Sequence, residues 1–575
     1  MAGIYGALVK NNQVTNGYSY FVHSTDDNFQ NNEVTLDGNM ILGRSVLNKF
    51  NGDRFFYEDD DAICCFEGIN YSDIKTPQRI IRQLKKNKNH FLKELRGVFT
   101  GFMFDKRNKT VTVFNDQFST KNVYYHYSKE HGLLFASRLH VLTTMMKQNS
   151  IPMEYNLDGI YSLALFGQLF FDSTMIKDVF KLDYGSSITF DTISGDQPHI
   201  EKYYTFKKEE RDISFDKALA DFEELMRISV TREWQKDKDY GLKHFSLLSG
   251  GMDSRINFML ANKLGFDNIT TFCYGNPDSE DMKISSQIAK DLSSSHITHQ
   301  ITRGNYLIDN VIENYLKLSD GMVLYTPSAT MKFSVEKINY QNFGTQHSGQ
   351  IGDTIGGSFI KENFDFQKNI ESIGWNGFVR ETELLTKVQS LDKIIQRYNH
   401  TDFEIYAYEQ RAINCSVTGD RVASHFTDQV SPFFDITLNE LTLSLPNDYR
   451  LNQKFYFSWL KKYHSEILNY KWEKVGIKPT NLSKVKYGTL FKKYNNGFKK
   501  YFNLKYDSMN PIGNWIRQDP TILNRMDTIF HHEIKNVNDG ELADNLSKIY
   551  RNDIFEFRNR FTVIGILLSL KIHFD

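Results

Sequence analysis

The chain has 575 residues, which is too long for one hydrophobic core, so we expect two large domains or three. Hydrophobic residues make up 40% and charged residues 24%, the balance of an ordinary globular protein. The 69 Lys and Arg residues nearly cancel the 70 Asp and Glu residues, leaving a net charge of −1. This balance gives no electrostatic reason to expect nucleic acid or an anionic membrane as the main partner.

Cysteine usage and hydropathy indicate a cytoplasmic protein. The four cysteines include no C-x-x-C pair, and the adjacent Cys64 and Cys65 cannot bridge each other without strain, so we expect free thiols and no structural zinc. The sequence begins without a basic segment followed by an apolar run, so no signal peptide is predicted. The longest apolar stretch, about 561–570, is shorter than the ~20 residues that span a bilayer, and we predict a buried helix there.

Residues 1–206 are predicted to form a first, strand-rich domain. Short apolar runs at 62–66, 97–104 and 110–114 are separated by turn-forming residues, and the last two runs predict a hairpin. A charged segment at 207–212 is the best candidate linker. From 213 to 575 the pattern changes: a helical spacing over 218–234 precedes an apolar strand at 244–248, a helix at 256–264 and a strand at 269–274. This order is typical of a parallel α/β sheet, followed by a mostly helical part beyond about 311.

The sequence L-L-S-G-G-M-D-S-R at 247–255 predicts a phosphate-binding loop. Two glycines let the backbone turn tightly, and the helix that follows supplies free N–H donors and its dipole to an anion. Ser249 and Ser254 offer hydroxyl donors to phosphate oxygens, and Asp253 offers a carboxylate to Mg²⁺. The loop lacks the Gly-Lys-Ser/Thr ending of the Walker type.

These residues resemble the S-G-G-x-D-S loop of the ATP pyrophosphatases, a group that includes asparagine synthetase, GMP synthetase and NAD synthetase. Members split ATP between its α and β phosphates and activate an acceptor as an adenylate. Three further segments resemble the asparagine synthetase branch: 348–357 (S-G-Q-I-G-D-T-I-G-G), 432–435 (P-F-F-D) and 474–479 (K-V-G-I-K-P). Arg255, Gln350 and Thr354 depart from the family pattern.

The resemblance implies roles for individual residues. Lys474 would stabilise charge in the transition state, and Asp253 and Asp353 would bind Mg²⁺. The positions expected to contact ATP are Leu248, Ser249, Gly250, Gly251, Asp253, Ser254, Tyr274 and Gly349. Two aspartates and one lysine would also suit acyl-adenylate formation on chemical grounds. The aspartates would bind the Mg²⁺ that neutralises pyrophosphate, and the lysine would stabilise the charge that develops in the transition state.

The first domain resembles the class II glutamine amidotransferases, through segments 95–105, 115–125 and 134–138. The resemblance implies the layered α+β sandwich of the N-terminal-nucleophile enzymes. In active members a cysteine after the initiator methionine attacks glutamine. Here M-A-G-I-Y-G matches that pattern except at Ala2, which has no nucleophile, and the glutamine-holding segment at 66–71 is also altered. We therefore predict that this domain does not hydrolyse glutamine.

The function predicted from the sequence is an ATP-dependent amide synthetase. It would adenylate a small-molecule or peptide carboxylate and transfer it to an amine, as do the glutaminase-inactive relatives β-lactam synthetase and the lasso-peptide cyclases, or enzymes of surface-polysaccharide clusters. An ammonia-dependent asparagine synthetase and a non-catalytic scaffold remain alternatives. A tRNA thiolase is disfavoured by the neutral charge and the absent cysteine pair. A homodimer is compatible with the sequence.

Overall fold

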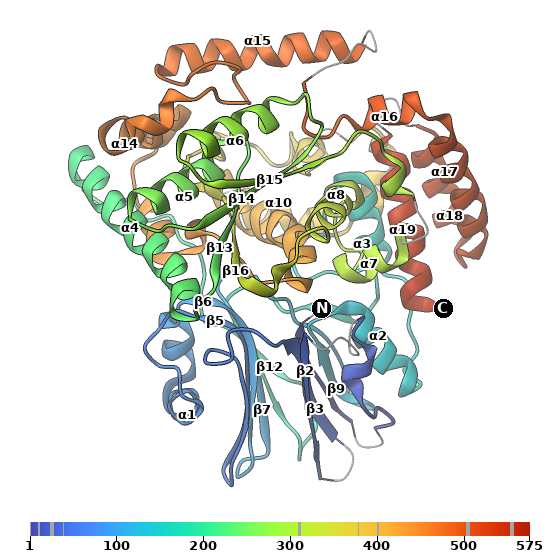
Figure 1. Ribbon diagram of the computed structural model, residues 1–575. Coiled ribbons are helices and arrows are strands. Elements are labelled where there is room, and N and C mark those ends of the chain that lie inside the picture. Colours follow the sequence, from blue (N-terminus) through green and yellow to red (C-terminus); the bar gives the residue numbers. More distant parts are fainter. Residues whose placement is uncertain are drawn as a thin grey trace.

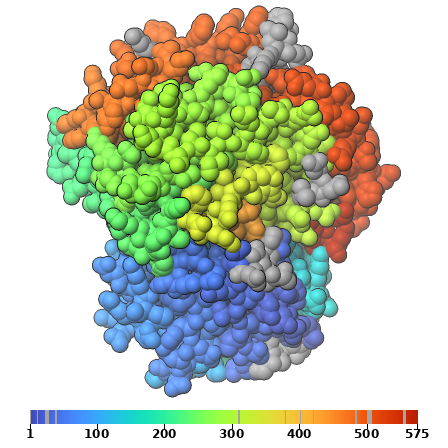
Figure 2. Space-filling view, viewed as in Figure 1, coloured from blue at the N-terminus to red at the C-terminus, as the bar shows by residue number. Residues whose placement is uncertain are grey.

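The structure is a computed structural model that describes residues 2–9, 12–22, 28–37, 40–308, 312–375, 377, 379–399, 402–501, 507–552 and 557–575; at 420, 482–484, 500 and 501 it describes only the backbone. Two antiparallel six-stranded sheets form the first part and a parallel five-stranded sheet lies at the centre of the second (Figure 1). The two parts abut along a broad boundary (Figure 2).

The first antiparallel sheet has the strand order β10-β8-β9-β1-β3-β2 and the second has β12-β11-β7-β6-β5-β4. The strands of the first are β1 (Gly3–Leu8), β2 (Phe29–Leu36), β3 (Met40–Leu47), β8 (Tyr124–Ser128), β9 (Gly132–Ala136) and β10 (Val179–Lys181). Those of the second are β4 (Phe55–Glu58), β5 (Ala62–Asn70), β6 (Gly97–Asp105), β7 (Thr110–Asn115), β11 (Ser186–Asp191) and β12 (His199–Lys202). The predicted hairpin is present as β6 and β7.

Side-chain alternation explains why these sheets stack. Along β6, Phe102 and Phe104 point into a core between the sheets, whereas Phe99 and Met103 join a second core on the outer face. Period-two alternation of this kind buries both faces of a strand. The helices of this part are α1 (Pro77–Glu94), α2 (Leu139–Gln148) and α3 (Leu157–Phe166). This part is therefore a mixed α/β arrangement of antiparallel sheets with helices.

The parallel sheet has the order β15-β14-β13-β16-β17. Its strands are β13 (Lys243–Leu247), β14 (Ile269–Gly275), β15 (Ser295–Gln300), β16 (Phe343–His347) and β17 (Gln429–Val430). On β13, His244 contacts Trp234 of α4 (Phe215–Asp239), and Phe245 packs with Val335 of α8 (Tyr325–Val335) on the opposite face. The predicted strand–loop–helix–strand unit is confirmed, with α5 (Met252–Lys263) after β13.

The rest of the second part is helical apart from β16 and β17, two short strands that the sequence did not predict. The helices around the sheet are α6 (Glu280–Asp291), α7 (Ile312–Ser319), α9 (Gly352–Ile355), α10 (Ser390–Tyr398), α11 (Phe403–Tyr406) and the π-helix η6 (Ala407–Val417). The later helices are α12 (Ile436–Leu443), α13 (Asn447–Arg450), α14 (Lys454–Tyr463), α15 (Leu482–Tyr501), α16 (Ile512–Gln518), α17 (Pro520–Glu533), α18 (Gly540–Arg551) and α19 (Arg558–Phe574).

The apolar stretch 561–570 lies in α19, buried as predicted. This helix contacts α7, α17 and α18 and also α2 and α3 of the first part, so it holds the two parts together. Among the described helices, none is long and apolar enough to cross a membrane. The predicted linker at 207–212 has no regular structure, but Lys208 pairs with Asp402 and Glu404 and fixes the segment to the second part.

Candidate active site

The predicted phosphate loop connects β13 to α5 at the carboxyl edge of the parallel sheet. The Ser254 hydroxyl accepts the N–H of Ser249 at 3.1 Å and lies 3.1 Å from the Ser249 hydroxyl, which in turn accepts the N–H of Gly251 at 3.1 Å. The N–H of Gly250 is donated to Asp281 at 3.0 Å. The N–H groups of Ser249, Gly250 and Gly251 are therefore all bonded to side chains, which order the loop. The loop leads into the N-terminus of α5, and helix N-termini favour anions.

The second predicted loop follows β16, the strand beside β13, so both loops lie at the same edge. Ile351 is left-handed (φ 56°), and α9, which carries Asp353, begins directly after it. A Cβ at Gly349 would lie 2.2 Å from the Ser254 nitrogen, and one at Gly352 would lie 2.5 Å from Cγ of Asp253. The two loops thus pack backbone against side chain, at a distance that only glycine allows. This contact brings the segments of Asp253 and Asp353 together.

The pKa values of both aspartates are raised, chiefly by loss of solvent. The pKa of Asp253 rises to about 7 through burial and the charge of Asp353, although a hydrogen bond from Tyr456 at 2.7 Å and the charge of Lys474 oppose the rise. Burial also raises the pKa of Asp353, against the charges of Lys474 and Arg411. Asp253 is half-buried and the Asp353 residue is exposed at the site. Two neighbouring carboxylates form a set that a hard divalent cation such as Mg²⁺ would fit and neutralise.

Lys474 lies on a tight turn that rests on the phosphate loop. The N–H of Gly476 is donated to the Trp472 carbonyl at 2.7 Å, and the N–H of Glu473 reaches the Gly250 carbonyl at 3.4 Å. Lys474 itself is exposed, with Nζ 5.6 Å from the Trp472 ring centroid, and its charge acts on both aspartates. The structure therefore brings the three residues predicted for chemistry to one edge of the sheet.

The remaining predicted positions lie around this edge. Leu248 is buried between β13 and α5, and its N–H is donated to the Phe272 carbonyl at 2.9 Å. Tyr274 is near the carboxyl end of β14 and, with Gln350, lines a neighbouring cavity of about 280 Å³. The Thr354 hydroxyl is donated to the Ile351 carbonyl at 2.6 Å and supports its own loop.

Arg255 does not extend toward a phosphate position. Its side chain is fully buried and donates to the carbonyls of Gly250 at 2.9 Å and Lys471 at 2.6 Å. It therefore joins the phosphate loop to the segment that precedes Lys474. Sequence reasoning missed Tyr456, Glu473 and Arg411 as neighbours of the aspartates, because their positions depend on contacts between distant segments. Glu473 is half-buried, and its pKa rises to about 7 through loss of solvent and the charge of Asp281.

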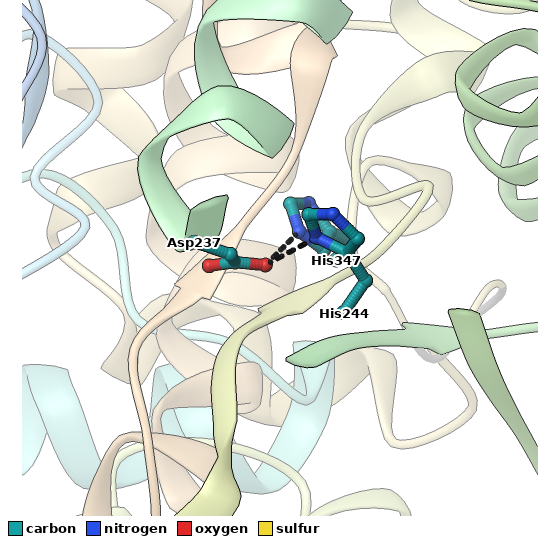
Figure 3. A group of neighbouring side chains, drawn as sticks. All are labelled: Asp237, His244 and His347. Carbon is teal, nitrogen blue, oxygen red and sulfur yellow. Dashed lines mark hydrogen bonds and ion pairs between the residues drawn. The ribbon is translucent and has the colours of Figure 1, made fainter. Parts of the chain in front are cut away.

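A second cluster of titratable side chains lies beneath the site, inside the protein. Figure 3 shows the imidazoles of His244 and His347 next to one carboxylate oxygen of Asp237, at 3.1 and 2.8 Å. The other oxygen of Asp237 accepts the N–H of Thr345 at 2.8 Å. Because these contacts satisfy the carboxylate, the cluster acts as a hydrogen-bonded connection between α4 and β16. Burial would lower the pKa of His347, but Asp237 and Glu233 raise it to about 9.

The position that resembles a glutaminase nucleophile carries no reactive group. Ala2 is buried in an apolar cluster with Val46 and Leu47. Cys64 and Cys65 lie on β5, fully buried in the cores on the two faces of that sheet. Burial raises the pKa of the Cys65 thiol to about 12 and raises that of Cys64, so neither thiol is a substitute nucleophile.

Comparison with known families matches both parts of the chain. Residues 71–204 match the glutamine amidotransferase domain family, and residues 221–412 match the asparagine synthase family. Asparagine synthetase [glutamine-hydrolyzing] 2 of Bacillus subtilis is 21% identical over 373 residues, which cover 59% of this chain and 48% of that protein. A provisionally assigned asparagine synthetase [glutamine-hydrolyzing] 1 of Methanocaldococcus jannaschii is 21% identical over 537 residues, covering 84% and 87%.

Solved structures give weaker likenesses. The glutamine phosphoribosylpyrophosphate amidotransferase of Bacillus subtilis aligns with 52% of this chain and 90% of that one, at 8% identity and a TM-score of 0.25. An ammonia-dependent NAD synthetase of Campylobacter jejuni aligns with 41% and 96%, at 13% identity and a TM-score of 0.18. Scores this low carry no argument about the fold. The family matches do: the chain has the two-part architecture of the asparagine synthetase family of ATP-dependent carbon–nitrogen ligases.

Proposed function

We propose that this protein forms an amide bond by activating a carboxylate with ATP, releasing AMP and pyrophosphate, and passing the acyl group to an amine. The observation that carries this proposal is the meeting of two loops that brings together Asp253, Asp353 and the charge of Lys474. Residues 213–575 would form the synthetase domain. The four cysteines are buried and none forms a disulfide in the structure, which suits a reducing cytoplasm.

The residues divide the work as follows. The 249–254 loop and the N-terminus of α5 bind the pyrophosphate end of ATP. Asp253 and Asp353 would hold Mg²⁺, which would supply positive charge to the leaving pyrophosphate. Lys474 stabilises the negative charge that develops during acyl transfer. Arg255 holds the phosphate loop and the segment before Lys474 together, because it donates to the carbonyls of Gly250 and Lys471.

The products of ATP distinguish this proposal from other nucleotide chemistry. The purified protein, supplied with Mg²⁺, ATP, an amine and a panel of carboxylates, should form AMP and pyrophosphate, as separated by ion-exchange chromatography. Asp353→Asn should lose this activity, since it removes a hard oxygen anion from the metal. Formation of ADP and phosphate, or full activity of Asp353→Asn, would overturn the assignment.

We further propose that residues 1–206 form an N-terminal-nucleophile-type domain that does not hydrolyse glutamine. Ala2, the inert thiols of β5 and the apolar surroundings of Ala2 support this. The amine would then come from ammonia or from an amino compound. Incubation with glutamine should release no glutamate above a boiled control. Sustained glutamate release by the intact protein would refute this part of the proposal while leaving the synthetase assignment in place.

A further inference from the structure

Beside the candidate active site lies a cavity of about 280 Å³ whose described lining carries no charged side chain. It is bounded by α8, the π-helix η6 and the loop after β16. The lining residues are Tyr274, Val323, Leu324, Pro327, Ser328, Thr330, Met331, Gln350, Trp375, Cys415, Ser416, Gly419 and Asn510. Two of them, Tyr274 and Gln350, belong to the sheet edge that also carries the two aspartates, so the cavity lies beside the segments of the reacting groups.

From this lining we infer that the cavity holds the acyl part of the carboxylate substrate, and that this part is apolar and uncharged. The inference rests on the proposed function, and it names the substrate class. Val323, Leu324 and Met331 give aliphatic walls, and Trp375, 39% exposed, offers an aromatic face. Ser328 and Gln350 supply neutral hydrogen-bonding groups. Binding pockets commonly combine apolar walls with a few polar positions of this kind.

Aspartate fits this lining poorly. Once one of its carboxylates reacts, the other carboxylate and the ammonium group would need charged partners, because burying an unpaired charge is costly. Arg411 is a cation near the rim: its guanidinium lies 5.6 Å from the Trp375 ring centroid and 5.8 Å from that of Phe359. The charge of Arg411 acts on Asp353, which is a proposed metal ligand. The reacting carboxylate would meet the nucleotide at that position, so Arg411 does not serve the rest of the substrate. The expected class is therefore a monocarboxylate, free or at the end of a peptide, with an apolar body.

Calorimetric binding and ATP–pyrophosphate exchange together test this inference with the full chain. Hexanoate and 3-phenylpropionate serve as apolar acids and L-aspartate as the charged one. The apolar acids should bind and support exchange, and aspartate should do neither. Leu324→Lys, which places an ammonium in the cavity, should weaken apolar-acid binding by at least about tenfold. Ile297→Lys, on an exposed aliphatic residue of β15 (39%), is the control and should bind as the wild type does.

The outcomes separate this inference from the proposed function. If aspartate supports exchange and the apolar acids do not, the substrate class is wrong and the synthetase assignment stands. If the apolar acids bind in a Leu324-dependent way but no acid supports exchange, the cavity assignment stands and the proposed function falls. If the apolar acids neither bind nor support exchange, the cavity assignment is wrong.

A different observation, on α15, carries a second inference. This helix lies at the outer edge of the molecule, at the top of Figure 1. It exposes a stripe of large apolar side chains spaced three and four residues apart, which we call the α15 stripe. Its members and their exposed fractions are Tyr487 (71%), Leu490 (57%), Phe491 (72%), Tyr494 (76%) and Phe498 (50%). A contiguous apolar stripe of this kind marks an interaction surface.

The charge of α15 identifies the kind of partner. The segment 482–501 contains six lysines and no acidic residue, a local excess that the near-neutral whole chain conceals. Lys486 and Lys493 are exposed beside the stripe. A second copy of this chain would bring two such helices together against strong repulsion, whereas an anionic lipid surface attracts the lysines and accepts the aromatic rings. The geometry points to peripheral binding of an anionic membrane through the α15 stripe.

Vesicle co-sedimentation of the full chain tests this second inference. The protein should sediment with phosphatidylcholine vesicles that contain phosphatidylglycerol, and not with phosphatidylcholine alone. Phe491→Ser combined with Tyr494→Ser should abolish sedimentation, as should Lys486→Glu combined with Lys493→Glu. Ile193→Ser, at an equally exposed residue (74%) far along the chain, is the control. Absence of binding to anionic vesicles, or a solution dimer that the Phe491→Ser, Tyr494→Ser pair dissociates, would overturn it.

Discussion

At the scale of single residues, Lys474 is exposed to solvent and its charge acts on the carboxylates of Asp253 and Asp353. It sits on a turn that touches the phosphate loop, and its ammonium lowers the pKa values that burial raises at Asp253 and Asp353. A compact cation on a flexible stem can follow charge that appears only during reaction. This property distinguishes it from Arg255, which is buried and whose two terminal nitrogens donate to backbone carbonyls.

Replacing Lys474 should therefore affect turnover more than ATP binding. Lys474→Ala is expected to lower kcat by about 10² to 10³, the usual effect of losing one transition-state contact. Lys474→Arg should recover little activity, because a planar guanidinium does not reproduce the ammonium. Steady-state kinetics at saturating ATP measure both. Lys478, an exposed lysine beyond the turn, is the control and should tolerate alanine. Normal turnover by Lys474→Ala would reassign the catalytic lysine.

At the scale of elements, the sequence predicted those helices and strands whose formation depends on local residue patterns. The β13–loop–α5–β14 unit and the β6–β7 hairpin follow from apolar runs and turn residues. β16 was not predicted, because its residues Thr345, Gln346 and His347 are polar and yet buried. These residues form hydrogen bonds to distant partners, including Asp237 and Gln429. Likewise, the family resemblance was enough to predict Asp353 as a site residue. Its neighbour Arg411 could not be predicted, because its position depends on tertiary contacts.

The connection between α4 and β16 should make stability depend on pH. The pKa of His347 in the folded state, about 9, is above its ordinary value of 6.5, so its contribution is complete below pH 6.5 and is lost as pH rises through 9. This shift corresponds to roughly 3 kcal/mol. Glu233, whose pKa burial raises to about 7, acts in the same direction. Asp237 and His244 are the other titratable groups of the cluster.

Urea unfolding of wild type and His347→Gln across pH 6 to 9.5 measures this contribution. The stability of the wild type should fall across that range, and His347→Gln should be less stable at the acid end and fall less steeply. His90→Gln, at an exposed histidine, should reproduce the wild-type profile. Parallel profiles for wild type and His347→Gln would show that His347 is not charged in the folded protein.

At the scale of the whole molecule, a buried ion cluster joins the two parts. Arg54 pairs with Glu67 at 3.0 Å and with Asp428, and Lys121 lies 3.1 Å from Glu67 and 2.7 Å from Asp428. Burial alone would raise the pKa of Asp428, but Arg54 and Lys121 hold it well below its ordinary value. The stability that Asp428 contributes is thus present above its unfolded pKa and lost as pH falls toward the folded one.

Removing one member of this cluster should loosen the interface. Asp428→Asn leaves Arg54 and Lys121 with Glu67 alone, at a cost on the order of 3–5 kcal/mol for a broken buried pair. Thermal unfolding should show a lower midpoint or an early transition of one part. Glu154→Gln breaks the exposed pair of Glu154 and Lys177 and should leave the midpoint unchanged. Equal midpoints for Asp428→Asn and wild type would exclude a stabilising role for the cluster.

The central claim is that the two loops assemble a site that activates a carboxylate on AMP. Oxygen-isotope transfer tests it directly: an acid that supports exchange is labelled with ¹⁸O in its carboxylate and turned over with ATP and an amine. Attack of the carboxylate on the α phosphate predicts one ¹⁸O atom in the AMP released and none in pyrophosphate. Label in inorganic phosphate together with ADP, or unlabelled AMP during amide formation, would contradict the account.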